Sequence, residues 1–303
     1  MSGNALGVDV GGTASRWVLV DRTGAVLARG TAPGANGHVF NPAERERLGA
    51  VLREIGAALA PHMTPEAAWL GITGFGEPVG EVVQSLVAEH LGVGGGSVRL
   101  SDDMELTYRS AFAPGEGHLV SAGTGSIGLH LAQDGIITRV GGRGLLIDDG
   151  GSGTWIALRA LDRLYRRIDE AGTPEGAEIL AEELFALVGG ADWDATRAFV
   201  YGSDRGRIGT LAQGVARAAQ RGDATAGGVL RDAGRELSRL ARALVTRLGT
   251  RPIGFVGGVI ALSPLIRAGI EAELMGHELR FLSPDPALYA AQQARDLSGG
   301  DKP

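Results

Sequence analysis

The sequence contains no cysteine and only a single lysine, Lys302, close to its end. Without cysteine the chain forms no disulfide, no thiolate zinc site, no iron–sulfur cluster and no cysteine nucleophile. A P-loop needs a lysine directly after its glycine-rich turn, so the position of Lys302 excludes that motif. A nucleotide bound by this protein must therefore be held by another arrangement of residues.

Long apolar runs and clusters of basic residues are missing as well. No run approaches the ~20 apolar residues of a membrane-spanning helix, and no charged-then-apolar leader opens the sequence. The net charge is −6, whereas nucleic-acid backbones are bound by clustered Lys and Arg. We therefore expect a cytoplasmic protein that acts on small molecules, without a membrane or nucleic-acid partner, and a homodimer is compatible with this composition.

Glycine is abundant instead, with 50 residues of 303, and many of these glycines separate short apolar segments. In the N-terminal region the turns GGTA and DRTG divide three such segments, which predicts a three-stranded meander. The predicted strands cover residues 5–10, 16–21, 25–30, 67–72 and 97–100. The predicted helices cover residues 43–60 and 80–90, and a further helix begins at Asp102 or Asp103. Strands that alternate with helices are typical of an α/β fold.

The meander is repeated in the second half of the chain, in HLVSAGTGSIGLHLAQDGIITRV at residues 118–140. A shift of 111 positions superimposes the turns of the two segments. The matching positions are Gly12-Thr13 with Gly123-Thr124, Ser15 with Ser126, and Gly24 with Gly135. Equal spacing over a whole meander indicates an internal duplication, so the two halves are expected to begin with the same topology.

Two such glycine-rich turns can hold a polyphosphate without any lysine. Each turn presents successive backbone N–H groups, glycine allows close approach, and threonine and serine hydroxyls add donors. Asp9 precedes the first turn and is expected to hold Mg²⁺ through water, which screens the phosphate charge. The alternative is that Asp9 caps local amides of the turn.

Five segments, in their order along the chain, resemble the N-acetylglucosamine/glucosamine kinase family, the BadF/BadG/BcrA/BcrD-type ATPase branch of the sugar kinase, heat-shock cognate and actin superfamily. The segments are GVDVGGTASRWVLVD, LSDDMELTYRSAF, SAGTGSIG, GGRGLLIDDGGSGTWIALRAL and IGFVGGVIALSPLIRAGI. The resemblance implies an α/β protein of two domains with duplicated actin-like, ribonuclease H-like topology, with ATP and sugar in a cleft between them. The expected domains are residues 1–115 with a C-terminal helix at about 285–303, and residues 116–284.

The resemblance also implies which residues bind ATP. The phosphate-binding residues would be Gly11, Gly12, Thr13, Gly123, Thr124, Gly125 and Ser126. Gly257 and Gly258 would border adenosine, although a glycine pair at this place is also typical of a tight connection between a strand and a helix.

Sugar contacts follow from the same resemblance. They match Asn36 in GANG and Asp149 in IDDGGSG, whose side chains can orient a polyol. The alternatives are a surface turn for Asn36 and a helix cap for Asp149. Where the family often has Gly-Asp-Glu-Gly-Ser, this chain has DDGGS, and the missing Glu leaves open which amino sugar and which C2 substituent are bound.

The catalytic candidate is Asp103, which aligns with the family's aspartate at the head of a helix and would also contact the sugar. A hydroxyl that attacks the γ-phosphoryl group needs a base to accept its proton, and a carboxylate at the end of a strand can do this. Asp102 fits the preceding position, and the alternative is that both carboxylates only cap the helix. The histidines show no metal-ligand spacing and are expected to be structural or exposed: His38, His62, His90, His118, His130 and His277.

The sequence thus predicts an ATP-dependent sugar kinase that phosphorylates a hydroxyl, expected to be O6, of an amino sugar such as N-acetylglucosamine or glucosamine. A non-catalytic ATP-binding switch of the same fold and a kinase for a non-sugar alcohol remain alternatives. Activators of 2-hydroxyacyl-CoA dehydratases and repressor/kinase proteins of the glucokinase type are excluded, because both carry cysteine motifs that this chain lacks.

Overall fold

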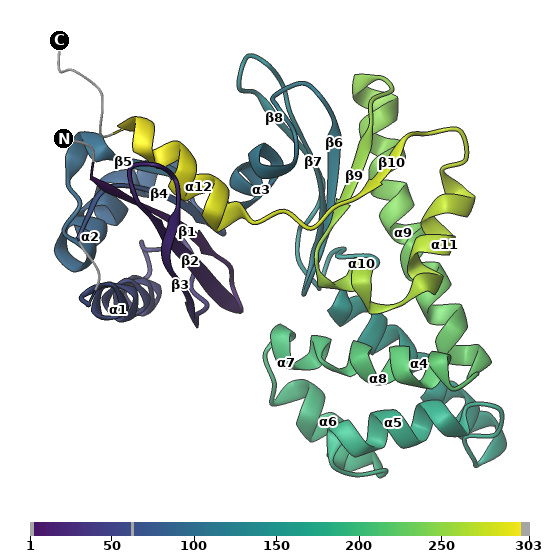
Figure 1. The fold of residues 1–303 in the computed structure, drawn as a ribbon. Helices are drawn as coiled ribbons and strands as arrows, with labels where there is room; N and C mark the ends of the chain where they lie inside the picture. The colour runs from purple at the N-terminus through teal and green to yellow at the C-terminus, as the bar shows by residue number, and fades with distance from the viewer. Residues whose placement is uncertain (1–2, 62–63, 298–303) are drawn as a thin grey trace. The chain divides into compact units, whose positions relative to one another are not determined.

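The computed structural model describes residues 3–61 and 64–297, and these divide into two compact units (Figure 1). The N-terminal unit consists of the described parts of residues 1–113 and 284–303, and the C-terminal unit of residues 114–283. His62 and the last part of the expected C-terminal segment, from residue 298 onward, lie outside the described residues. Within the described ranges, no helix combines the length and the apolar character that crossing a bilayer requires.

The N-terminal unit contains a five-stranded sheet in the order β3-β2-β1-β4-β5. Its strands are β1 (Asn4–Val10), β2 (Ala14–Val20), β3 (Val26–Pro33), β4 (Pro65–Ile72) and β5 (Val98–Ser101). Strands β1, β2 and β3 pair antiparallel and form the predicted meander, whereas β4 and β5 run parallel to β1. The carboxyl ends of β1, β4 and β5 therefore meet at one edge of the sheet.

Helices complete the N-terminal unit and cover its sheet. They are α1 (Pro42–Leu59), α2 (Gly80–Leu91), α3 (Asp103–Ala111) and α12 (Pro286–Ala294), with short 3₁₀ turns at Glu77–Val79, Gly95–Ser97 and Arg295–Leu297. Apolar side chains of α1 and α2 share one core cluster with β1, β2 and β4, and α12 forms another with the same strands. Gly7 lets α12 lie directly on β1, because a Cβ there would collide with the Ala287 carbonyl.

The C-terminal unit repeats this arrangement with the order β10-β9-β6-β7-β8. Its strands are β6 (His118–Ala122), β7 (Ser126–Leu131), β8 (Ile137–Gly141), β9 (Ile253–Val256) and β10 (Leu279–Phe281). The meander β6-β7-β8 is antiparallel, while β9 runs parallel to β6 and β10 parallel to β9. Strand order and direction match the first sheet, which confirms the predicted duplication.

Most of the helices belong to the C-terminal unit. They are α4 (Gly153–Ala171), α5 (Glu178–Val188), α6 (Trp193–Tyr201), α7 (Arg205–Gly209), α8 (Leu211–Gln220), α9 (Ala224–Leu248), α10 (Gly258–Leu262) and α11 (Pro264–Glu273). The long helix α9 packs against β6, β7 and β8, and α4 packs against α9. The N–H of Gly153, at the start of α4, donates to the carbonyl of Gly123 in the glycine-rich turn between β6 and β7.

Candidate active site

Three polar side chains of the N-terminal unit follow the carboxyl ends of neighbouring parallel strands. Asp9 lies near the end of β1, Thr73 directly follows β4, and Asp103 follows β5. The backbone N–H of Thr73 donates to the carbonyl of Val10 at 2.9 Å, which ties the two strand ends together. Ligands of α/β proteins bind preferentially at this kind of edge.

The sequence left two roles open for Asp102 and Asp103, helix cap and catalytic base, and the two side chains have different surroundings in the structure. Asp102 is the N-cap of α3, and its carboxylate accepts a hydrogen bond from the backbone N–H of Met104 at 3.1 Å. Asp103 is the first helical residue, and its carboxylate accepts a hydrogen bond from the Thr73 hydroxyl. Burial, and then the charges of Asp102 and Asp9, raise the pKa of Asp103 from its ordinary value of 3.8 to about 7. A carboxylate with such a pKa is suited to accept a proton near neutral pH.

Asp9 is the second residue at this edge whose carboxyl group has a raised pKa. Its side chain is 15% exposed, and burial raises its pKa to about 6, against the opposing effect of Arg16 at 4.0 Å. The charge of Asp285, the N-cap residue of α12, raises that pKa further. The carboxyl groups that act on this edge therefore outnumber the positively charged side chains there, and such an excess suits a divalent cation.

The structure also limits how such a cation could be held. In the described part of the chain, no group of three or more His, Asp or Glu side chains is arranged to bind a metal ion. A cation near Asp9 would therefore take few ligands from the protein. Mg²⁺ normally retains several waters and completes its shell with phosphate oxygens, so the residues fit the predicted water-mediated site.

The first glycine-rich turn joins β1 to β2 and is braced by the loop after β3. The N–H of Gly11 donates to the carbonyl of Ala14 at 3.2 Å, and the carbonyl of Gly11 accepts from the N–H of Ala35 at 3.1 Å. A Cβ at Gly34 would collide with the backbone of Gly12, so the loop can approach the turn only because position 34 is glycine.

The loop after β3 also positions Asn36. Its amide Nδ2 donates to the Glu44 carboxylate at 2.6 Å, and its Oδ1 accepts from the N–H of His38 at 2.9 Å. The N–H of the next residue, Gly37, donates to the carbonyl of Thr73 at 2.9 Å. The structure thus connects the Asn36 loop to the residue that hydrogen-bonds Asp103.

The second glycine-rich turn, between β6 and β7, is supported by the first turn of α4. The carbonyl of Gly123 accepts from the N–H of Gly153 at 2.9 Å, and that of Thr124 accepts from the Thr154 hydroxyl at 2.9 Å. The closing bond of this turn, Gly123 N–H to Gly125 carbonyl at 2.9 Å, spans one residue fewer than its counterpart in the first turn. A Cβ at Gly123 would meet no protein atom within 4 Å, so the space above it is open to a ligand.

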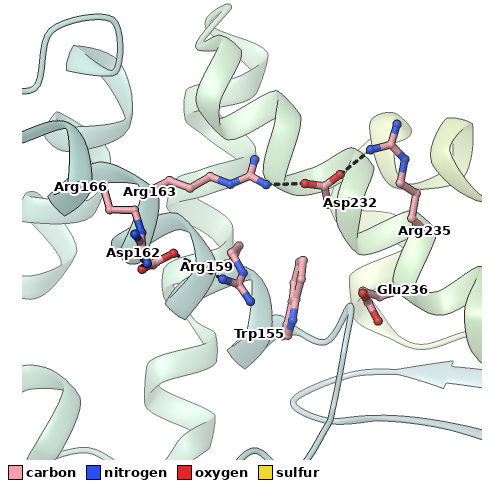
Figure 2. A pocket seen from close by; sticks show the side chains of 8 residues that line it. All are labelled: Trp155, Arg159, Asp162, Arg163, Arg166, Asp232, Arg235 and Glu236. Carbon is pink, nitrogen blue, oxygen red and sulfur yellow. Dashed lines mark hydrogen bonds and ion pairs between the residues drawn. The ribbon is translucent and has the colours of Figure 1, made fainter.

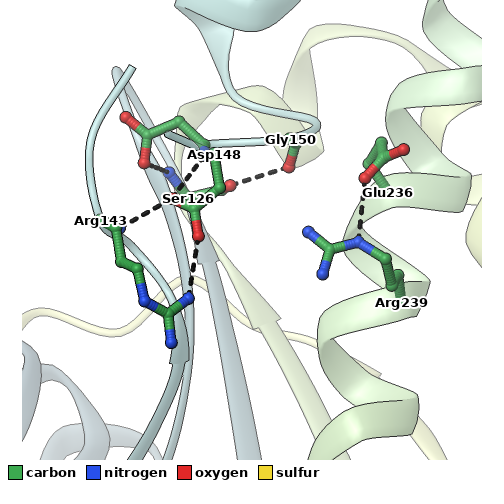
Figure 3. A network of polar contacts seen from close by, with 7 residues as sticks. Ser126, Arg143, Asp148, Gly150, Glu236 and Arg239 are labelled. Atoms are coloured by element: carbon green, nitrogen blue, oxygen red, sulfur yellow. Dashed lines mark hydrogen bonds and ion pairs between the residues drawn. The ribbon is translucent and has the colours of Figure 1, made fainter. Parts of the chain in front are cut away.

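Ser126 and Asp149 lie behind this turn. The Ser126 hydroxyl, expected to offer a donor to phosphate, donates instead to the Gly150 carbonyl at 2.8 Å (Figure 3). The N–H of Ser126 lies 3.4 Å from Asp149 Oδ1. Asp149 is 3% exposed, its Oδ2 has no hydrogen-bond partner among the described residues, and burial raises its pKa. Asp149 does not cap α4, because Ser152 does so, accepting from the N–H of Trp155 at 3.1 Å.

Asp148 organises the backbone around Asp149. Its Oδ1 accepts from the N–H groups of Arg143 at 2.7 Å and Asp149 at 2.8 Å, and its Oδ2 pairs with the Arg143 guanidinium at 3.2 Å (Figure 3). Asp149 has a φ of 66°, in the left-handed region. Aspartate tolerates this conformation better than most residues, and the hydrogen bond from its own N–H stabilises it.

Gly257 and Gly258, which follow β9, have different surroundings. Gly257 has a φ of 102°, and a Cβ there would collide with the Ala122 carbonyl, so glycine is required by the tight connection to α10. A Cβ at Gly258 would meet no protein atom within 4 Å. The tight connection therefore explains the glycine at 257, whereas the open space beside Gly258 leaves room for a ligand such as adenosine.

His118 and His130 make contacts of the kind expected for structural histidines. His118 Nε2 lies 2.9 Å from the Gly249 carbonyl, and His130 Nδ1 lies 2.8 Å from the Gly117 carbonyl. Their rings are 5.0 Å apart, and burial lowers the pKa of His118. Both histidines thus connect strands of the C-terminal unit to neighbouring loops.

Sequence reasoning missed three supporting residues: Thr73 and Glu44 in the N-terminal unit and Thr154 in the C-terminal unit. Each acts by supporting a predicted residue, through hydrogen bonds to Asp103, Asn36 and Thr124 respectively. Of these three residues, only Thr73 could have been found from the sequence. It follows a predicted strand in ITG, as Thr13 and Thr124 follow predicted strands.

Comparisons with known proteins identify the family of this chain and agree with its fold. The model of the BadF/BadG/BcrA/BcrD ATPase family matches residues 6–291. The N-acetyl-D-glucosamine kinase of Dictyostelium discoideum is 27% identical, over 94% of this chain and 96% of the relative. A Chromobacterium violaceum structure, provisionally assigned as an N-acetylglucosamine kinase, has a TM-score of 0.71 at 26% identity and covers 98% of this chain and 99% of its own. A ROK family glucokinase from Streptomyces griseus, solved with glucose and AMPPNP, shares the fold with a TM-score of 0.58 at 20% identity, over 97% of this chain and 100% of its own.

Proposed function

This chain belongs to the BadF/BadG/BcrA/BcrD ATPase family, and from that premise we propose that it is an ATP-dependent sugar kinase. The reaction is transfer of the γ-phosphoryl group of ATP to a hydroxyl, O6, of an amino sugar such as N-acetylglucosamine or glucosamine. The observation that carries the proposal is the placement of Asp103. Its carboxyl group has a pKa of about 7 and accepts a hydrogen bond from Thr73. The carbonyl of Thr73 in turn accepts a hydrogen bond from the loop that contains Asn36. The curated relative from Dictyostelium supports the amino sugar as acceptor.

Asp103 is the general base of the proposed reaction. The sugar hydroxyl attacks the γ-phosphorus, the bond from that phosphorus to the β,γ-bridging oxygen breaks, and the hydroxyl proton passes to Asp103 as ADP leaves. The hydrogen bond from Thr73 fixes the carboxylate, so that its oxygen is aimed before the hydroxyl arrives. Asp102 takes no part in the chemistry, because its carboxylate is engaged at the start of α3.

The glycine-rich turns are assigned to the phosphates of ATP. Gly11, Gly12 and Thr13 form one turn and Gly123, Thr124 and Gly125 the other, while Ser126 holds the second turn in shape through Gly150. Asp9 would hold Mg²⁺ through water, and the bound cation would screen the phosphate charge. Gly258 is assigned to the border of the adenosine site and Gly257 to the backbone turn beneath it.

Asn36 and Asp149 are assigned to the sugar. Glu44 fixes the amide of Asn36, which leaves its orientation defined before a polyol binds. Asp149 has a buried carboxylate oxygen without a partner among the described residues, and buried polar atoms in native proteins are seldom left so. A sugar hydroxyl is a donor of the kind that this oxygen requires.

The test is a panel of sugars measured for release of ADP in the presence of Mg²⁺. We expect release that depends on an amino sugar and a product phosphorylated at O6, identified by NMR. Phosphorylation of a different hydroxyl or of a neutral hexose alone would reject the amino-sugar assignment. Binding of ATP with no release of ADP for any sugar or other alcohol would indicate a non-catalytic ATP-dependent switch.

A further inference from the structure

A cavity of about 400 Å³ lies between α4 and α9 in the C-terminal unit (Figure 2). It is lined by Trp155, Arg159, Asp162, Arg163 and Arg166 of α4 and by Asp232, Arg235 and Glu236 of α9. None of these residues has a role in the proposed binding of ATP or sugar. The cavity is therefore separate from the residues assigned to phosphoryl transfer.

The arginines around the cavity outnumber the carboxylates that they pair with. Asp162 accepts from Arg159 and Arg166, and Asp232 accepts from Arg163 and Arg235 (Figure 2). Neighbouring ion pairs join Glu236 to Arg239 and Glu273 to Arg235 and Arg242. The lining itself holds four arginines and three carboxylates, which leaves a surplus of one positive charge in the cavity.

Trp155 gives the cavity a flat apolar surface beside this charge. The guanidinium carbon of Arg159 lies 5.5 Å from the centre of the indole ring. Aromatic faces stack on sugar or base rings, and the planar guanidinium group matches the geometry of a phosphate. We propose that this cavity is a second ligand site, which binds a small phosphate ester carrying a ring, namely a sugar phosphate or a nucleotide.

The position of Trp155 links this site to the glycine-rich turn between β6 and β7. Trp155 directly follows Gly153 and Thr154, whose N–H and hydroxyl donate to the carbonyls of Gly123 and Thr124. A ligand stacked on Trp155 contacts the turn of helix that holds those carbonyls, so its binding changes the affinity of the turn for ATP. This coupling rests on the proposed phosphate role of the turn, whereas the binding itself does not.

Intrinsic tryptophan fluorescence tests the binding directly. Glucose 6-phosphate in one titration and uridine 5′-monophosphate in another are added to the full chain and to its variants. We expect a saturable change with at least one probe, which is absent in Trp155→Phe and at least about tenfold weaker in the double variant Arg159→Gln/Arg166→Gln. Arg247→Gln, an exposed arginine at the end of α9 outside the cavity, should titrate like the wild type.

A variant of the glycine-rich turn separates binding in this cavity from binding at the proposed ATP site. The signal should persist in Gly123→Val, in which phosphate binding at the turn is obstructed, so failure of the kinase proposal would leave the result intact. Three results would overturn the proposal. They are loss of the fluorescence change in Gly123→Val, equal affinities of the wild type and the double variant for the probe, and no saturable change with either probe. Sedimentation showing that the fluorescence change follows association of two copies of the chain would also overturn it.

Discussion

Asp102 and Asp103 are consecutive and both accept a hydrogen bond from the N–H of Met104, yet only Asp103 also accepts one from the hydroxyl of Thr73. One residue therefore starts a helix, while the other faces the strand edge where Asp9 lies. This division predicts opposite outcomes for the same substitution at adjacent positions.

Asp103→Asn should abolish most of the phosphoryl transfer while ATP and sugar still bind. Asparagine keeps the size of the side chain but cannot accept the hydroxyl proton, and loss of a general base costs about 10²–10⁴ in rate. The measurement is turnover under saturating Mg-ATP and amino sugar, with sugar binding followed by calorimetry. Asp102→Asn is the matched control and should remain active, because Asn caps helices about as well as Asp. An inactive Asp102 variant beside an active Asp103 variant would reverse the assignment.

The raised pKa of Asp103 predicts how turnover and stability depend on pH. Turnover should rise with pH through about 7, since the base must be ionised. The folded protein retains the Asp103 proton between the unfolded pKa near 3.8 and the folded pKa of about 7, so its free energy of unfolding falls across this window as pH rises.

Asp103→Asn removes that penalty and should therefore stabilise the ligand-free protein at pH 8. The expected gain is on the order of 2 kcal/mol, allowing for solvent screening, and it should largely disappear at pH 3.5, where the folded state is protonated and the unfolded state mostly so. Urea unfolding at the two pH values measures the difference. An Asn variant that is less stable than the wild type at pH 8 would contradict the burial of this charge.

Gly123→Val should weaken ATP binding without unfolding the protein. The φ of Gly123 is not in the left-handed region, and a Cβ there meets no protein atom within 4 Å, so the added side chain would occupy the open space that we propose for phosphate. Gly96→Val is the control, since Gly96 is equally unobstructed and lies in the 3₁₀ turn before β5. Equal ATP affinities of the two variants in a titration would remove the phosphate role of the turn.

Asn36→Ala should raise the KM for sugar with little change in ATP affinity. Loss of a hydrogen bond from an oriented side chain costs roughly 1–3 kcal/mol, which corresponds to a rise in KM of roughly 5- to 150-fold. Asn41→Ala is the matched control, because Asn41 caps α1 at the end of the same loop. That change should cost about 1 kcal/mol of stability and leave KM unaltered. A parallel rise in KM in both variants would indicate a general disturbance of the loop.

Local patterns predicted the elements of this fold well. The glycine turns and the alternation of strands and helices predicted the first meander, its repeat and α1 to α3, because each depends on neighbours within a few residues. The equivalence of Gly12 with Gly123 predicted a shared topology that the strand orders confirm. The five ordered segments predicted the family, which the matching family model confirms.

Side-chain partners were predicted less well, because they depend on groups far apart in the chain. The Ser126 hydroxyl was expected to bind phosphate, and its hydrogen bond to the Gly150 carbonyl could not be predicted from the sequence. The left-handed backbone of Asp149 and its shielded carboxylate likewise depend on Asp148 and on the turn packed against them. The cavity between α4 and α9 had no sequence signal, since its lining comes from helices separated by more than fifty residues.

By itself the sequence determined that this protein lacks cysteine chemistry and a P-loop, that it repeats a glycine-rich meander, and that two aspartates start one helix. Only the tertiary structure showed which of those aspartates caps the helix, and it brought Thr73, Asp9 and the Asn36 loop to Asp103. The reason is physical: turns and caps are set by backbone geometry over a few residues, whereas the pKa of a carboxyl group depends on burial and on charges supplied by distant strands.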